Sequence, residues 1–219
     1  MQKIPKKIHF VWIGDSELPE KSICYINKFK KTYDDYEVKI WNDSDVLNEN
    51  IIPESLIDYY FNTSLLPAFK ADILRYLIIN THGGLYFDID FEPLKKLPDC
   101  FLNFEFLGGI QNNGEVAIGF FAGSKNNRLL NEVINNIPQS IETAISNDYY
   151  RNEGIYRITG PQFFDKFASL YKKESDYFFF TEEYFYPYWF LEKERKDENF
   201  EQTSPLSYAV HHWDLSWKI

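Results

Sequence analysis

Runs of apolar residues bounded by turn residues divide the first part of the chain into strands and a helix. Residues 6–13 are rich in β-branched and aromatic side chains and end before Gly14, which predicts a buried first strand. Apolar residues at helical spacing predict a helix over residues 19–31, and the alternation at residues 36–42 predicts a second strand. This order is typical of the opening of a nucleotide-binding α/β sheet.

The next segment has the most informative pattern. Residues 44–64 are polar and contain paired tyrosines and a proline, which suits small helices beside the sheet. A helix is predicted from Pro67 through Ala68–Asn80, and the glycine pair that follows is typical of a helix C-terminus. Residues 85–91, LYFDIDF, then predict a strand that carries two aspartates one residue apart.

The second half predicts a hairpin with the turn at Asn112–Gly114, then two helices and a late strand. In order, these elements cover residues 104–111, 115–123, 127–136, 161–171 and 176–181. The charged run at 192–202 predicts a solvated, mobile loop. The aromatic, histidine-rich tail at 204–219 is expected to fold back over a site.

Composition restricts the class of protein. With 219 residues the chain is long enough for one domain with a full core, and a net charge of -10 argues against nucleic acid as a partner. Two cysteines and no apolar targeting segment favour a reducing, cytoplasmic setting. No apolar run approaches the ~20 residues of a membrane span. If the protein acts on a membrane-linked molecule, we therefore expect it to do so from the inner membrane surface. The 19% aromatic content is explained most simply by a Phe-rich core.

Asp88 and Asp90 are the first candidates for chemistry. On a strand, residues two apart lie on the same face, so both carboxylates are expected to reach one ion while Ile89 points into the core. Hard divalent cations take such oxygen ligands. A capped, solvated strand end is the alternative when the pair is considered alone.

Asp72 and Arg75 share one face of the preceding helix because they are three residues apart. One interpretation is a surface ion pair of little energetic weight. The other is a ligand-binding site, in which the arginine neutralises a phosphate or holds a sugar hydroxyl and the aspartate accepts hydrogen bonds from sugar hydroxyls. The short link through Gly83 and Gly84 favours the second, because it brings both residues to the sheet end that carries the aspartate pair.

Four segments resemble one family. They are IPKKIHFVWIG at 4–14, AFKADILRYLIINTHGGLYFDIDFEPLKKL at 68–97, TGPQFF at 159–164 and HHWDLSW at 211–217. In order and spacing they resemble the glycosyltransferases whose sugar-binding region contains the DXD motif, glycosyltransferase family thirty-two, and more distantly the clostridial glucosylating toxins.

The resemblance implies an α/β GT-A fold with a mixed central sheet flanked by helices. It also implies a single domain over 1–219, with a nucleotide-sugar half at 1–97 and an acceptor side with the closing tail at 98–219. Manganese, or magnesium, would be the cofactor, and transfer from a nucleoside diphosphate sugar would proceed with retention. Manganese is favoured because it also tolerates an imidazole ligand.

Carried over residue by residue, the resemblance implies a catalytic set of Asp72, Arg75, Asp88 and Asp90. Asp72 and Arg75 would hold the donor sugar, Asp88 would contact ribose or sugar and the ion, and Asp90 would bind the ion directly. Val11 would give backbone contacts.

The resemblance also implies roles for aromatic residues and the tail. Trp12 would lie against the nucleobase, Trp217 would donate its indole N–H to the β-phosphate, and His212 would be an ion ligand, with His211 as the next candidate. His9 is instead expected to be a hydrogen-bonded core histidine. His82 is expected to complement the helix dipole at a helix end.

The sequence therefore predicts a retaining, metal-dependent transferase that moves a hexose, with a UDP-linked donor favoured, to a surface glycan or lipid-linked saccharide. Attack on the face that the diphosphate leaves is preferred, because no nucleophile stands out; Gln162, Asn112 and Asn113 would at most stabilise positive charge. The alternatives are a non-catalytic carbohydrate- or nucleotide-binding module, a phosphoesterase, and a transferase with a protein acceptor.

Overall fold

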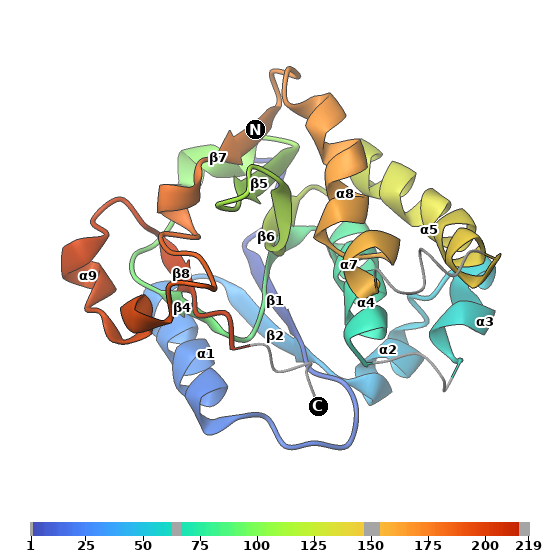
Figure 1. Ribbon diagram of the computed structural model, residues 1–219, viewed down its shortest axis with the longest axis horizontal. Coiled ribbons are helices and arrows are strands. Elements are labelled where there is room, and N and C mark those ends of the chain that lie inside the picture. Colours follow the sequence, from blue (N-terminus) through green and yellow to red (C-terminus); the bar gives the residue numbers. More distant parts are fainter. Residues whose placement is uncertain (1, 63–66, 147–153, 215–219) are drawn as a thin grey trace.

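The centre of the molecule is one mixed β-sheet. The computed structural model describes residues 2–62, 67–146 and 154–214 (Figure 1). The six strands of the sheet are β1 (Lys7–Val11), β2 (Glu37–Trp41), β3 (Gly84–Phe87), β5 (Phe106–Ile110), β6 (Val116–Gly123) and β7 (Tyr177–Phe180). Their order is β2-β1-β3-β6-β5-β7, with β2, β1 and β3 parallel and β6 antiparallel to both of its neighbours. The predicted α/β class with a mixed sheet is confirmed.

A second, two-stranded sheet brings the tail back to the middle of the chain. β4 (Phe91–Pro93) pairs antiparallel with β8 (Ala209–His211), and Phe91 lies opposite His211. The predicted return of the tail is therefore confirmed for the described residues; Trp217 lies outside them.

Helices cover both faces of the central sheet (Figure 1). Helix α1 (Glu20–Thr32) lies on one face, near β4 and β8, whereas α4 (Pro67–His82), α5 (Arg128–Ser146) and α8 (Pro161–Ala168) lie together on the other. The shorter elements are α2 (Asp43–Glu49), η1 (Glu54–Leu56), α3 (Ile57–Tyr60), η2 (Asp99–Asn103), α7 (Ile155–Ile158), η3 (Ser169–Tyr171), η4 (Glu182–Tyr184), η5 (Lys193–Asp197) and α9 (Phe200–Thr203).

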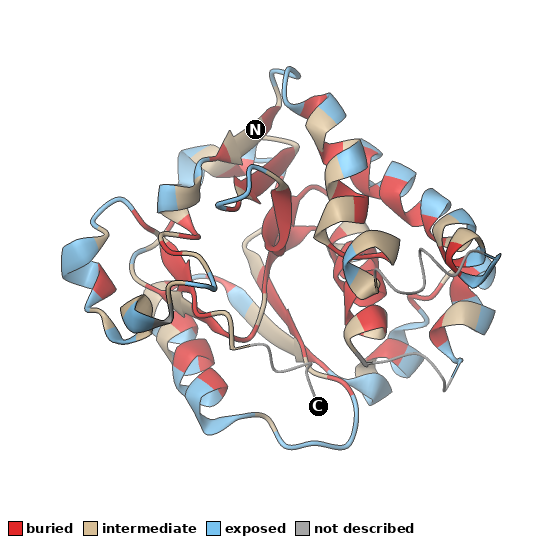
Figure 2. Cartoon of the chain, in the orientation of Figure 1, coloured by how far each residue is buried: buried red, intermediate tan, exposed pale blue. Residues whose placement is uncertain are grey.

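Alternation along the strands separates two apolar cores. Ile8 and Phe10 of β1 pack with Phe29 of α1 on one face, while Val11 belongs to the core under α4. Figure 2 shows the central strands β1, β3, β5 and β6 as mostly buried, whereas the edge strands β2 and β7 are partly exposed. Since burying a large apolar side chain contributes about 1.5–3 kcal/mol, this burial fixes the strand ends at which the polar site residues lie.

Helix α4 is apolar on nearly every side, and Asp72 and Arg75 are its buried polar exceptions. The helix ends at glycines 83 and 84, which have φ of +65° and +115°. A Cβ on Gly84 would lie 2.7 Å from the carbonyl oxygen of Lys7. Only glycine therefore lets β3 leave the helix and lie directly beside β1.

The aspartate pair lies in a turn, which corrects the strand predicted over 85–91. β3 ends at Phe87, and the N–H of Phe91 donates to the carbonyl of Asp88 at 3.1 Å. The N–H of Asp88 also donates to the carbonyl of Gly119, where a Cβ would lie 3.0 Å from Asp88 Oδ2. The turn, and not strand alternation, therefore brings both carboxylates to the same side. Ile89 is buried as predicted.

The run at 192–202 is solvated as predicted, because its described charged residues are exposed or partly exposed. It is not a loop, however: it forms η5 and α9, where Phe200 is buried and Arg195 is paired with Glu198. The missed signal is the single aromatic residue within the charged run. The hairpin turn is confirmed, and Gly114 has φ of +86° there.

Candidate active site

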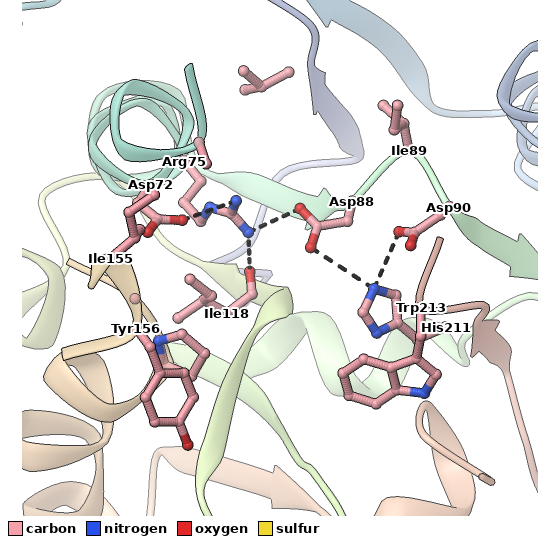
Figure 3. A pocket seen from close by; sticks show the side chains of 14 residues that line it. Asp72, Arg75, Asp88, Ile89, Asp90, Ile118, Ile155, Tyr156, His211 and Trp213 are labelled. Atoms are coloured by element: carbon pink, nitrogen blue, oxygen red, sulfur yellow. Dashed lines mark hydrogen bonds and ion pairs between the residues drawn. The ribbon is translucent and has the colours of Figure 1, made fainter. Parts of the chain in front are cut away.

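A cavity of about 280 Å³ opens where β1 and β3 end. Its walls come from α4, the turn after β3, β6, the α7–α8 corner and the returning tail (Figure 3). One side is polar and carries Asp72, Arg75, Asp88, Asp90 and His211. Four residues that were predicted from the segment 68–97 thus line one cavity, together with His211 from the distant tail.

Arg75 occupies the middle of the polar side and is 3% exposed. Its Nη1 donates to Asp88 Oδ1 at 2.8 Å and to the carbonyl of Ile118 at 2.9 Å, while Nη2 lies 3.1 Å from Asp72 Oδ1. The guanidinium lies 4.8 Å from the ring centroid of Tyr86. Because a buried charge needs pairing and hydrogen bonds, these contacts fix Arg75 between two carboxylates, and the surface ion-pair interpretation is wrong.

The two carboxylates beside Arg75 each accept a hydroxyl hydrogen bond. Thr159 Oγ1 donates to Asp72 Oδ2 at 3.1 Å, and the hydroxyl of Tyr86 donates to Asp88 Oδ1 at 2.7 Å. Burial raises the pKa of Asp72 to about 6, although Arg75 and Thr159 act in the opposite direction. Burial likewise raises the pKa of Asp88 against the effect of Arg75.

Asp90 is paired differently from Asp88. Asp90 Oδ1 lies 3.1 Å from His211 Nε2, and Asp90 Oδ2 accepts from the N–H of Asp214 at 2.9 Å. The same His211 nitrogen lies 3.9 Å from Asp88 Oδ2. Burial would raise the pKa of Asp90, but His211 and the Asp214 N–H outweigh it and hold that pKa at about 2. Burial would lower the pKa of His211, yet the two carboxylates raise it.

Asp88, Asp90 and His211 have the chemistry of a divalent metal site. One ligand atom from each lies within 4.8 Å of the other two, and Figure 3 shows the three side chains pointing toward one another. Two carboxylate oxygens and an imidazole nitrogen form a set that Mn²⁺ accepts. The second ring nitrogen of His211, Nδ1, is buried and has no hydrogen-bond partner among the described residues, so only Nε2 is aimed at the carboxylates.

The geometry does not bring His212, the predicted ion ligand, to this cluster. Its Nε2 lies 3.0 Å from Glu92 Oε2, and its ring stacks on Tyr25 with 5.0 Å between centroids. The physical reason is the strand β8, since neighbouring residues at a strand end point to opposite sides. His211 faces Asp90, so His211 takes the place of His212 as the proposed ligand.

The predicted nucleobase residues lie at the end of β1. Val11 lines the cavity, and Trp12 follows it in a partly exposed position with its indole N–H donated to the carbonyl of Ser16 at 2.8 Å. Stacking on a base remains a prediction for Trp12.

The two remaining histidines lie away from the cavity. His9 is 2% exposed, its Nε2 lies 3.0 Å from the carbonyl oxygen of Gly83, and its Nδ1 accepts from Trp41 Nε1 at 3.0 Å. The predicted core role of His9 is confirmed. His82 lies in the last turn of α4, 3.2 Å from Glu49.

Three residues of the site were missed by sequence reasoning. Thr159 belongs to the TGPQ motif, in which the sequence suggests a role for Gln162 and not for the threonine. Tyr156 and Trp213 line the cavity from α7 and from the residue after His212. Trp213 could have been singled out because it directly follows the histidine pair, whereas no local sequence pattern distinguishes Tyr156.

Comparison with known proteins agrees with this geometry. Residues 19–107 match the family model described as glycosyltransferase sugar-binding region containing DXD motif. Inositol phosphoceramide mannosyltransferase 3 of Schizosaccharomyces pombe is 27% identical over 184 residues, which cover 79% of this chain and 47% of that protein. Subversion of eukaryotic traffic protein A of Legionella pneumophila is 25% identical, over 77% of this chain and 28% of that protein. The chain thus spans less than half the length of these two curated relatives.

Solved structures support the fold. The PaToxG glycosyltransferase superposes with a TM-score of 0.58 at 21% identity, covering 78% of this chain and 70% of the other. The UDP-bound glycosyltransferase domain of the YGT toxin gives the same TM-score at 13% identity, covering 82% and 80%. The central sheet is therefore that of the GT-A glycosyltransferases. In its matched region, its relatives and this fold, the chain is similar to the glycosyltransferases whose sugar-binding region contains a DXD motif.

Proposed function

We propose that this domain transfers a hexose from a nucleoside diphosphate sugar to a saccharide or glycolipid acceptor, with retention and with the help of a divalent ion. One observation carries the proposal. The buried Arg75, bracketed by Asp72 and Asp88, opens onto the same cavity as the Asp88, Asp90 and His211 cluster. Asp72, the proposed acceptor of hydrogen bonds from sugar hydroxyls, therefore lies beside the three residues proposed to hold a metal-bound diphosphate.

The charge of the cavity supports an ion-bound donor. Three carboxylates, Asp72, Asp88 and Asp90, outnumber one guanidinium and one imidazole, which leaves an excess of negative charge for a cation. Asp88, Asp90 and His211 would hold the ion, for which manganese is favoured over magnesium because of the imidazole. The bound ion would neutralise the leaving diphosphate as its bond to the sugar stretches.

The protein groups would orient the donor sugar. Asp72, which accepts a hydrogen bond from Thr159, would also accept from sugar hydroxyls, and Arg75 keeps the Asp72 carboxylate fixed. Both residues are buried, so their orientation is set before the donor arrives. Apart from Asp72, Asp88 and Asp90, no carboxylate of a described residue lines the cavity. Same-face attack is therefore preferred over a covalent intermediate.

The size of the cavity suits sugar rings rather than a whole nucleotide. Its volume of about 280 Å³ is at or below the ~300–1,000 Å³ of typical pockets for larger ligands. The base would extend beyond the cavity along the loop after β1, where Trp12 is predicted to stack on it. The UDP-bound toxin neighbour favours uridine diphosphate as the carrier.

A lipid-linked or surface glycan is the proposed acceptor. The mannosyltransferase relative is named for a phosphoceramide substrate, and in the described part of this chain no helix has the length and apolarity to cross a membrane. We infer that the domain works in the cytoplasm and reaches such an acceptor at a membrane surface. A protein acceptor is the alternative, since several relatives are toxins.

A thermal-shift screen tests the proposed function. UDP-glucose, UDP-galactose, UDP-N-acetylglucosamine and GDP-mannose are each added with Mn²⁺ and with chelator. Stabilisation of the folded state by one nucleotide class only with Mn²⁺, followed by slow donor hydrolysis, is expected. Equal stabilisation with chelator would contradict the metal-dependent donor site, and binding without any hydrolysis or transfer would favour a non-catalytic module. Hydrolysis that no acceptor diverts to transfer would favour a phosphoesterase.

A further inference from the structure

We propose that the outer part of the cavity, between the rings of Tyr156 and Trp213, is the acceptor subsite and takes a pyranose ring against an aromatic face. The inference rests on the proposed transfer reaction and adds the place and the ring chemistry of its second substrate. Tyr156 lies on the side of Asp72, and Trp213 lies on the side of His211 (Figure 3).

The backbone around Trp213 is held in place by Asp90. The N–H of His212 donates to the carbonyl of Asp90 at 3.0 Å, and the N–H of Asp214 donates to its Oδ2 at 2.9 Å. Between these two bonds Trp213 has φ of +54°, a left-handed conformation that is costly for a bulky residue. Such a conformation persists only where the surroundings impose it, so the position of this ring is determined by the site.

The ring of Trp213 is also fixed in orientation. Its indole N–H donates to the carbonyl of Tyr188 at 3.0 Å, and its ring lies 4.2 Å from that of His211 and 5.2 Å from that of Trp189, centroid to centroid. The side chain remains partly exposed and lines the cavity. Because the only polar atom of the side chain is engaged, it offers the cavity an apolar face.

Tyr156 is fixed in the same way on the opposite wall. Its hydroxyl donates to Glu115, which also accepts from Asn113 Nδ2 at 2.9 Å and from Gln111 Nε2 at 3.2 Å. The side chain is 39% exposed. The polar end of this ring therefore belongs to the β5–β6 turn, and its face is what remains for a ligand.

The surroundings indicate which ligand fits. The cavity between the rings is lined by apolar side chains, including Ile118 and Ile155, whereas its polar groups gather at the donor end. Pyranose rings present C–H faces that stack on aromatic rings while their hydroxyls stay free. A sugar held there would lie next to Asp72 and Arg75, where the donor hexose is expected.

Four variants test the subsite: Tyr156→Ala, Tyr156→Phe, Trp213→Phe and the control Tyr59→Ala. Tyr59 is a matched control because its hydroxyl also donates to a glutamate, Glu142, and its ring does not line the cavity. Each protein, with Mn²⁺ and the donor selected by the thermal-shift screen, is given methyl glucoside, galactoside, mannoside and N-acetylglucosaminide. Sorbitol serves as an acyclic polyol. Glycoside binding is followed by saturation-transfer NMR, and transfer is measured relative to donor hydrolysis.

Wild type and Tyr59→Ala are expected to bind at least one glycoside and not sorbitol. Tyr156→Ala should lower the ratio of transfer to hydrolysis about ten-fold or more, while Tyr156→Phe and Trp213→Phe, which keep a ring face, should lower it less than about three-fold. Donor hydrolysis without glycoside contact in wild type would overturn the subsite, as would a Tyr156→Ala ratio equal to that of wild type. Loss of UDP-sugar binding in Tyr156→Ala would reassign the ring to the donor. Absence of any ion-dependent donor binding in wild type would instead refute the proposed function itself.

Discussion

Two buried histidines in this molecule are in opposite electrostatic situations. His9, at the junction of β1 and α4, is 2% exposed, and His211, at the junction of β4 and β8, is 9% exposed. His9 contacts neutral groups, the carbonyl of Gly83 and the indole N–H of Trp41. His211 faces the carboxylates of Asp88 and Asp90.

The difference shows that partners, not burial, decide what a buried imidazole does. Burial lowers the pKa of His9 to about 4, so this ring is neutral and structural at pH 7. The same burial acts on His211, but the two carboxylates reverse the direction of the shift. The carboxylates that raise the pKa of His211 would equally attract a cation in place of that proton, whereas a ring with neutral partners is suited to a core.

The largest expected effect comes from removing the charged partner of His211. Asp90→Asn keeps the volume of the side chain but removes a proposed ion ligand and the charge opposite the imidazole. We expect ion-dependent donor hydrolysis to fall by roughly 1,000-fold or more, because the leaving diphosphate would no longer be neutralised. The measurement is steady-state hydrolysis of the donor across a Mn²⁺ titration.

Asp99→Asn is the control for this substitution, because Asp99 is an exposed aspartate that pairs with Lys6 and does not line the cavity. It should retain wild-type hydrolysis. Retention of full activity by Asp90→Asn would remove the basis of the metal proposal.

A second test compares neighbouring histidines on opposite sides of β8. His211→Ala should weaken Mn²⁺ binding about 10- to 100-fold, because one of three proposed ligands is lost. His212→Ala should weaken it much less, since His212 contacts Glu92 and Tyr25 instead. Isothermal titration with Mn²⁺ and UDP measures both. The reverse ranking would restore His212, the original prediction, as the ligand.

The sequence predicted the strands and helices well where local patterning decides them. The α4 helix, its glycine terminus and the β5–β6 hairpin follow from spacing and turn chemistry, and the gathering of Asp72, Arg75, Asp88 and Asp90 follows from the tight link between α4 and β3. The choice between His211 and His212 does not follow, because it depends on the register of β8 against β4, which is a long-range contact. The role of Tyr156 depends on the α7–α8 corner packing against β6, and no local pattern encodes that.

The pH dependence of stability tests the other half of the comparison. The pKa of His9 is lowered from 6.5 in the unfolded chain to about 4 in the folded protein. As pH falls below 6.5, the unfolded chain binds a proton that the folded protein does not, so stability present above pH 6.5 is lost as the pH falls toward 4. Between pH 7 and 5 we expect protonation of His9 in the unfolded chain to lower the free energy of unfolding by about 2 kcal/mol.

Urea unfolding of wild type and His9→Gln at both pH values isolates this effect. Glutamine does not titrate, so the loss of stability of His9→Gln between pH 7 and 5 should be smaller than that of wild type by about 2 kcal/mol. Equal pH dependence of the two proteins would mean that the pKa of His9 is the same in its pocket as in the unfolded chain.

The smallest effect should come from the neutral partner of His9. Trp41→Phe removes the indole N–H that His9 Nδ1 accepts at 3.0 Å and leaves a buried acceptor unpaired, which should cost about 1–2 kcal/mol of the free energy of unfolding. An unpaired Nδ1 also binds a proton more readily, so the pKa of His9 should rise in an NMR titration. Lys39→Gln removes the ammonium that lies 3.7 Å from the Trp41 ring centroid but keeps the indole donor, and should leave the His9 pKa unchanged. If Trp41→Phe also left that pKa unchanged, burial alone would hold His9 neutral, and the contrast with His211 would depend only on the carboxylates around His211.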